Sequence, residues 1–442
     1  MSIPLERMYH YLRSMHSSDT IIYQFLPHGY KNLDNLEIVH SQAKNNFEWQ
    51  TTPRLIYHDQ EPLIYDYYQH DDLNTCARNT LIPQLKYRLP EVQDLLIKMA
   101  TDMHLRAKFS YQYHAWDSVL LCHSEKNSQE LDNYERNGYI GVYWWSHAAI
   151  ARDWFRYAKY DLELHTEFDN IKKDFLIYNR AWTGTREYRL KFSELLIEHE
   201  LLKHCDTKFA PLDGDCHYTQ HQFKNPALSI KRQDLEKFYA INNSPPTSSA
   251  DYDSKEYNQC GIEIVLETVF DDQRNHLTEK TLRAIACGKP FLLVSTPGSL
   301  EYLKSYGFQT FNGLIDESYD TIQNSSERLT AVVKEMQRLA NLPTSQKKQL
   351  WQKLYQIAEH NRELFFSESW IKQIFSEYQQ NFEHAVVQLS EQNQGKHFQK
   401  VITLDTIEKM NHAGMPNSMQ QQITTNRQQV MDWLNKHFLH KY

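Results

Sequence analysis

Residues 262–299 have the sequence IEIVLETVFDDQRNHLTEKTLRAIACGKPFLLVSTPGS. The apolar run 262–270 is typical of a buried strand, and residues 278–287 have helical spacing. A turn is predicted at 288–290, followed by a strand over 291–295 and a second helix. The order strand, helix, strand, helix predicts a parallel sheet that is covered by helices.

The same alternation occurs earlier in the chain. Short apolar and β-branched runs predict strands at 20–26, 54–58, 118–122, 140–144 and 174–179. Helical spacing occurs at 90–103, 148–158 and 186–202, and it dominates 325–378. These patterns predict an α/β protein with two Rossmann-like domains that face a cleft, together with a helical C-terminal extension.

The chain has 442 residues, which is more than one hydrophobic core usually serves. Residues 161–173 are charged and lack the strong apolar pattern of the predicted strands and helices. We therefore place a domain boundary there. The predicted domains are an N-terminal acceptor-side domain at 1–165, a C-terminal domain for the donor nucleotide sugar at 166–325, and the helical extension at 326–442.

Composition excludes several classes of protein. The 12 Gly and 14 Pro residues are too few for a collagen-like or Gly-rich repeat architecture. The six Cys residues form no C-x-x-C pair, which argues against a zinc knuckle. The formal net charge of -8 argues weakly against a surface that tracks nucleic-acid phosphates. No apolar run approaches the ~20 residues of a membrane span, and the N-terminus lacks a signal-peptide core, so we expect a cytoplasmic protein.

Polar clusters directly after the predicted strands are the places to search for a site, because ligands of doubly wound sheets bind outside the carboxyl ends of the strands. The sequence has four such clusters, namely 58–61, 123–126, Asn179-Arg180 with Arg186 and Arg189, and 276–280.

The cluster 276–280 is the most informative. Thr278 is a candidate N-cap, so free amides and the positive end of the helix dipole would face an anionic diphosphate. Lys280 would add a positive charge, and Glu279 could accept hydrogen bonds from ribose or sugar hydroxyls. The alternative is an ordinary capped helix with solvent-facing charges.

The segment His276-Leu277-Thr278-Glu279-Lys280, followed by a helix, a Gly-Lys-Pro turn and a strand, resembles the donor-binding segment of the family 10 fucosyltransferases. The resemblance implies that Glu279 and Lys280 contact the nucleotide sugar. At the position of His276 the family has an aromatic or polar residue. A histidine here is a departure from the aromatic residue.

A second stretch is similar to the same family. The strand that ends at Asn179, then Arg186 and a helix, matches the family's strand, asparagine, arginine and helix. The resemblance implies that the arginine faces the diphosphate. Arg186 fits best by spacing, with Arg180 and Arg189 as alternatives, and any of the three could instead form a surface ion pair. Guanidinium groups bind phosphate with two hydrogen bonds, which suits a transferase that uses no metal.

A third, shorter match is the strand at 55–58 that runs into Asp59, Glu61 and a proline. A carboxylate there could remove the proton of the acceptor hydroxyl. Glu61 is our candidate base and Asp59 the second, and the alternative is a routine loop carboxylate.

Three further residues follow predicted strands and are candidates for the acceptor side, namely His123, Glu125 and His147. Because His147 stands beside two tryptophans, its alternative role is packing.

The sequence therefore predicts a metal-independent, inverting glycosyltransferase that uses a UDP- or GDP-linked sugar as co-substrate, has no other cofactor and acts on a glycan. One alternative is a phage-type transferase that acts on a hydroxymethylated DNA base. Another is a non-catalytic protein that binds carbohydrate or nucleotide. Dehydrogenases, kinases and metal hydrolases are disfavoured because the motifs G-x-G-x-x-G, G-x-x-x-x-G-K-[ST] and H-E-x-x-H do not occur.

Overall fold

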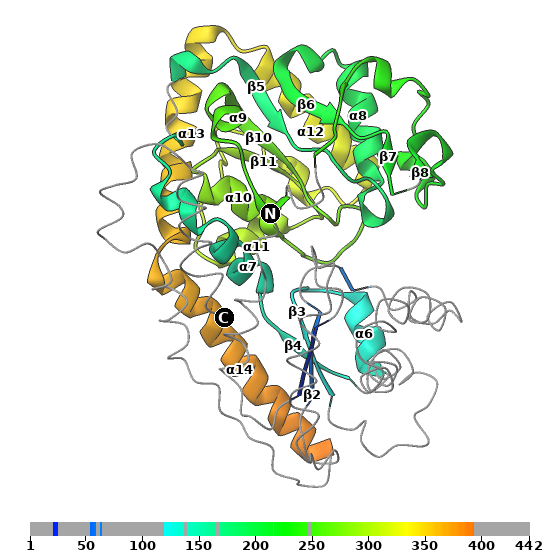
Figure 1. Ribbon diagram of the computed structural model, residues 1–442, viewed down its shortest axis with the longest axis vertical. Helices are drawn as coiled ribbons and strands as arrows, with labels where there is room; N and C mark the ends of the chain where they lie inside the picture. Colours follow the sequence, from blue (N-terminus) through cyan, green and yellow to red (C-terminus); the bar gives the residue numbers. More distant parts are fainter. Residues whose placement is uncertain are drawn as a thin grey trace, which may run out of the picture. The chain divides into compact units, whose positions relative to one another are not determined.

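The computed structural model describes residues 21–24, 54–58, 62–63, 119–136, 139–164, 168–214, 216–244 and 249–392 (Figure 1). The chain forms two compact units. The C-terminal unit contains residues 147–371, and the N-terminal unit contains the described residues up to Ser146 together with 372–392.

The N-terminal unit contains a parallel four-stranded sheet in the order β1-β2-β3-β4. Its elements are β1 (Ile21–Gln24), β2 (Arg54–His58), β3 (Val119–His123), α6 (Gln129–Arg136) and β4 (Ile140–Tyr143). The later part of α14 (Glu368–Gln392) belongs to this unit, where Asn381 donates to the carbonyl of Tyr143 at 2.8 Å. Trp144 packs its ring against Tyr378 of the same helix. The four strands confirm the sequence predictions within a few residues.

The C-terminal unit is a larger α/β fold. Its strands are β5 (Lys173–Ile177), β6 (Cys205–Phe209), β7 (Leu212–Asp213), β8 (Cys216–His217), β9 (Ala240–Ile241), β10 (Cys260–Leu266) and β11 (Phe291–Val294). Its helices are α7 (Ser146–Trp154), which begins one residue before the unit, α8 (Tyr188–Glu198), α9 (Ser254–Gln259), α10 (Glu279–Ala286), α11 (Ser299–Ser305), α12 (Ser325–Ala340) and α13 (Thr344–Phe365). Helices α8 and α12 pack together, as do α10 and α13, and the two pairs flank the sheet (Figure 1).

The five main strands of this unit are parallel and have the order β11-β10-β5-β6-β9. The chain starts at the central strand β5, proceeds outward through β6 and β9, and then returns to β10 on the other side of β5. The direction of winding therefore reverses between β5 and β10, and we call this place the switch point. In doubly wound sheets, ligands bind at the switch point, outside the carboxyl ends of the strands.

The segment 278–290 folds as its sequence predicts. Thr278 is the N-cap of α10, and its side chain accepts a hydrogen bond from the amide of Lys280. At the other end, Gly288 has φ 63° and donates to the carbonyl of Ile285, while Lys289 donates to Ala284. These two bonds form a Schellman motif, which needs a left-handed residue and so favours glycine.

The units divide the chain earlier than the boundary that we expected at 161–173. Helix α7 belongs to the C-terminal unit, because Arg152 donates to the carbonyls of Phe365 at 2.8 Å and Phe366 at 2.7 Å, at the end of α13. Helices α12 and α13 pack on the C-terminal sheet and its helices.

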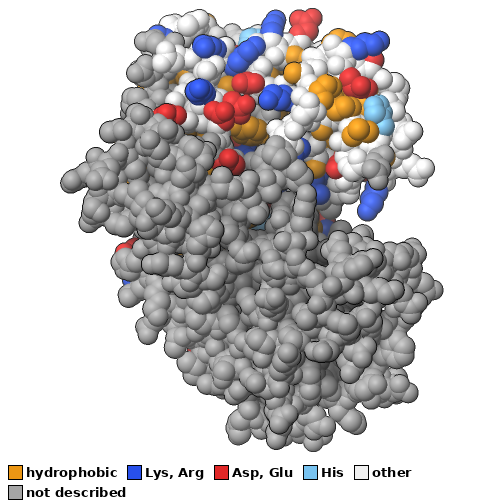
Figure 2. Space-filling model, viewed as in Figure 1, with side chains coloured by type: hydrophobic (Ala, Val, Ile, Leu, Met, Phe, Trp, Pro, Cys, Tyr) orange, Lys and Arg blue, Asp and Glu red, His pale blue; other side chains and the backbone are white. Residues whose placement is uncertain are grey.

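None of the helices in the described part of the chain is long and apolar enough to cross a membrane. On the visible described surface, Lys and Arg side chains alternate with Asp and Glu (Figure 2). This face therefore carries charges of both signs.

Arg152 offers a test of how α7 is held. We expect Arg152→Ala to lower the free energy of unfolding by about 2–3 kcal/mol, because two charge-assisted bonds to the last carbonyls of α13 are lost. The matched control is the exposed Arg136, which donates to Asp132 and Asn133 of its own helix. Arg136→Ala should change the free energy of unfolding by less than about 0.5 kcal/mol. Equal losses in calorimetry would contradict this account.

Candidate functional site

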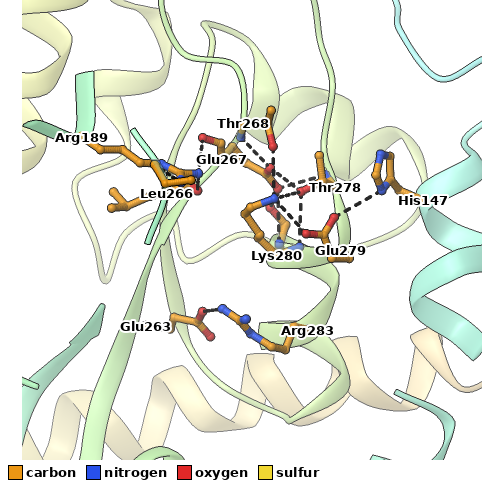
Figure 3. Close-up of polar contacts among 12 residues, drawn as sticks. His147, Arg189, Glu263, Leu266, Glu267, Thr268, Thr278, Glu279, Lys280 and Arg283 are labelled. Carbon is orange, nitrogen blue, oxygen red and sulfur yellow. Dashed lines mark hydrogen bonds and ion pairs between the residues drawn. The ribbon is translucent and has the colours of Figure 1, made fainter. Parts of the chain in front are cut away.

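The carboxylate of Glu267 organises the carboxyl end of β10 (Figure 3). It is 0% exposed, and it accepts hydrogen bonds from the amides of Thr278 and Thr281 at 3.0 and 3.3 Å. The hydroxyls of the same threonines donate to it at 2.7 and 2.5 Å. A negative charge at a helix N-terminus is stabilised by the helix dipole. Glu267 therefore holds the start of α10 against the end of β10.

This network corrects one expectation from the sequence, that the first amides of α10 are open to a diphosphate. The amides of Thr278 and Thr281 bind Glu267, and the amide of Lys280 lies 3.4 Å from the hydroxyl of Thr278. The charge of Glu267 also offsets the helix dipole. An anion at this place would therefore be bound mainly by side chains.

Lys280 is the most accessible cation of α10 at the switch point, with a side chain that is 19% exposed. Its ammonium group donates to Glu279 Oε1 at 2.8 Å, to Thr268 Oγ1 at 3.1 Å and to Thr278 Oγ1 at 3.2 Å (Figure 3). A lysine has three N–H donors, and all three have acceptors here. A phosphate would thus take the place of one of these acceptors.

Two histidines complete the surroundings of Glu279. Its second carboxylate oxygen, Oε2, lies 3.5 Å from His147 Nδ1, and the pair is ionic only when His147 is protonated. The ring of His147 meets that of His276 edge to face, at 5.1 Å between centroids. The structure thus brings His147, which we had assigned to the acceptor side, together with His276 and Glu279 of the donor segment.

The arginines after β5 divide into two groups. Arg189 is buried and donates to the carbonyls of Ala181, Leu266 and Glu267, so it joins the loop after β5 to the end of β10. Arg180 and Arg186 are only partly buried.

Burial lowers the pKa of the Arg180 guanidinium from its usual value, Glu279 acts in the opposite direction, and Arg189, Arg283 and Arg186 lower it further. Of the three arginines, Arg189 is bound to backbone carbonyls.

Asn179 also has a structural role. Its amide donates to Ser193 Oγ at 2.8 Å, and its carbonyl accepts from Asn242 at 3.2 Å. These bonds tie the end of β5 to α8 and to the residue after β9. Asn179 thus shapes the loop that presents Arg180.

The remaining candidates lie in the N-terminal unit or outside the described residues. His123 is the last residue of β3 in the N-terminal unit, and Glu125 follows that strand. Glu125 accepts from the amide of Leu63 at 2.6 Å and from Ser128 Oγ at 2.5 Å. Asp59 and Glu61 lie outside the described residues.

Sequence reasoning missed two buried carboxylates of β10 and its end. Glu267 is one, and Glu263 is the other, which pairs with Arg283 at 2.8 Å and accepts from the hydroxyl of Tyr257 at 2.6 Å. A charged residue inside the apolar run 262–270 is the signal that could have indicated them, because a buried carboxylate requires partners.

Within the described ranges, no group of three or more His, Cys, Asp or Glu side chains is arranged to hold a metal ion. Comparisons with protein-family models, with curated proteins and with solved structures found no match to this chain.

His276 makes the stability of the protein depend on pH. Burial lowers its pKa well below the ordinary value, and His147, Arg274 and Lys280 lower it further, against the effect of Glu279. The unfolded chain takes up a proton on this ring below about pH 6.5, whereas the folded protein does not. Stability therefore falls as the pH drops below about 6.5, by up to about 1.4 kcal/mol per pH unit from this group.

Urea unfolding at several pH values between about 7.5 and 5.5 checks this dependence. We expect a shallower pH dependence in His276→Gln, which has no titrating ring. His360 is exposed on α13, so His360→Gln should keep the wild-type slope. If His276→Gln also kept it, the neutral, buried state of His276 would be refuted.

Proposed function

We propose that the chain is a nucleotide-sugar-dependent glycosyltransferase whose C-terminal unit binds the donor at the switch point between β5 and β10. The observation that carries the proposal is the contact of the Lys280 ammonium group with Glu279 Oε1, at 2.8 Å, at the start of α10. The reversal of strand order marks the same place independently, because it follows from the topology alone.

The chemistry of these side chains fits a nucleotide sugar. A departing nucleoside diphosphate carries negative charge, which Lys280 with Arg180 and Arg186 would stabilise. Glu279 offers carboxylate oxygens to hydroxyls of the ribose or the sugar. A ligand that carries both phosphate and hydroxyl groups would satisfy both kinds of side chain at once.

The resemblance of 276–280 to the family 10 fucosyltransferases supports the same assignment. We further propose that the two units are the halves of a GT-B transferase and that the acceptor is a glycan hydroxyl. Glu61, or Asp59 in its place, is the proposed base of an inverting, metal-independent displacement, and His123 and Glu125 are proposed for the acceptor side.

Lys280 gives the direct test of donor binding. UDP-, GDP-, CMP- and dTDP-sugars are screened by thermal shift, since a ligand of the folded state raises its stability. We expect one of them to bind, and Lys280→Ala to weaken its affinity about 10- to 100-fold, as expected for a charge-assisted hydrogen bond of about 1.5–3 kcal/mol.

The control is Lys304→Ala on α11, where Lys304 forms an exposed ion pair with Glu301. Donor affinity should be unchanged in this variant. Transfer assays on glycans and on hydroxymethylated DNA then identify the acceptor. Binding without turnover would favour a non-catalytic protein, and no response to any nucleotide sugar would overturn the proposed function.

A further inference from the structure

The carboxylate of Glu279 is held from two sides. Lys280 donates to Oε1 at 2.8 Å, and His147 Nδ1 lies 3.5 Å from Oε2 (Figure 3). The side chains of Glu279 and His147 are only 9% and 3% exposed, so neither has much room to rotate. The carboxylate therefore has a defined orientation.

His147 comes from a helix that is distant in sequence from α10. It is the second residue of α7, and α7 is joined to the end of α13 by Arg152. Helix α13 in turn packs on α10. The edge-to-face contact with His276 supports the imidazole from the loop that precedes α10. The position of His147 is thus fixed by the packing of α7, α13 and α10 in the C-terminal unit.

Two groups compete for Glu279. If Lys280 alone contacted it, the carboxylate could turn both oxygens toward the ammonium group and neutralise the charge that a phosphate needs. The imidazole of His147 beside Oε2, which forms an ion pair with Glu279 when it is protonated, opposes this rotation. Each carboxylate oxygen also has a second lone-pair site, which leaves acceptor capacity for a ligand hydroxyl.

We propose that His147 is a positioning residue that holds Glu279 for the hydroxyl-bearing part of the donor and keeps Lys280 available for the diphosphate. The proposal rests on the proposed function of the same site. It requires a hydrogen on Nδ1, either in the neutral tautomer that carries it there or in the protonated ring. The group that His147 recognises is thus Glu279, and the ligand is recognised through Glu279.

A ligand pair separates this role from simple packing. Inorganic pyrophosphate carries the charge of the diphosphate but no hydroxyl, so its binding depends on the cations alone. A nucleotide sugar carries both. Loss of the Glu279 orientation should therefore weaken binding of the nucleotide sugar and spare pyrophosphate, whereas a general defect in folding weakens both.

The experiment measures both ligands by calorimetry in the full chain, with UDP-glucose or GDP-fucose as the sugar nucleotide, whichever binds the wild type. We expect His147→Ala and His147→Phe to weaken the nucleotide sugar about tenfold, near the effect of one hydrogen bond, and pyrophosphate less than about twofold. His147→Asn should restore binding to within about threefold, because an amide nitrogen can occupy the place of Nδ1.

Matched controls make the outcomes distinct. His217, in β8, contacts Glu236 at 3.3 Å and is not part of the candidate site. His217→Ala should therefore bind both ligands as the wild type does. Lys280→Ala should weaken both ligands. Should His147→Ala fail to fold, the comparison of His147→Phe with His147→Asn carries the test.

Unchanged nucleotide-sugar affinity in His147→Phe, or an equal loss of both ligands without rescue by Asn, overturns the positioning role and leaves the proposed function standing. A wild-type protein that binds none of the screened nucleotide sugars overturns both.

Discussion

The buried carboxylate of Glu267 is the interaction on which the C-terminal unit depends. Its side chain binds the start of α10 through Thr278 and Thr281, while its backbone carbonyl accepts from Arg189 and Tyr188 of α8. Its amide donates to Val294 of β11 at 3.0 Å. One residue therefore joins two strands and two helices at the switch point. Removing its carboxylate would leave several buried donors without an acceptor, which is costly in a low-dielectric interior.

This arrangement changes how an anion would be bound. In many doubly wound folds the amides at a helix start contact the phosphate directly. Here Glu267 accepts from the amides of Thr278 and Thr281, and the ammonium group of Lys280 is the cation beside them. Side-chain cations can be tuned by their neighbours. Glu279 is an example, because it contacts Lys280 at 2.8 Å and His147 at 3.5 Å.

The sequence predicted the segments with strong local signals and missed those that depend on tertiary contacts. The cap at Thr278 and the turn at Gly288 are local, so they were found. Strand β6 was missed because its middle residues are polar and only partly buried, and β9 because it has two exposed residues. The meeting of His147 with Glu279 could not be predicted, because it depends on how α7 docks beside α10. The sequence left Arg189 as an alternative to Arg186 for the phosphate, because its bonds to backbone carbonyls depend on tertiary structure.

Hydrogen–deuterium exchange with and without the nucleotide sugar tests the central claim most directly, because it locates the ligand without any substitution. The account predicts slower exchange in two segments that flank the switch point, residues 178–190 after β5 and residues 266–287 from the end of β10 through α10. Protection that is confined to other segments while the ligand is bound would contradict the account.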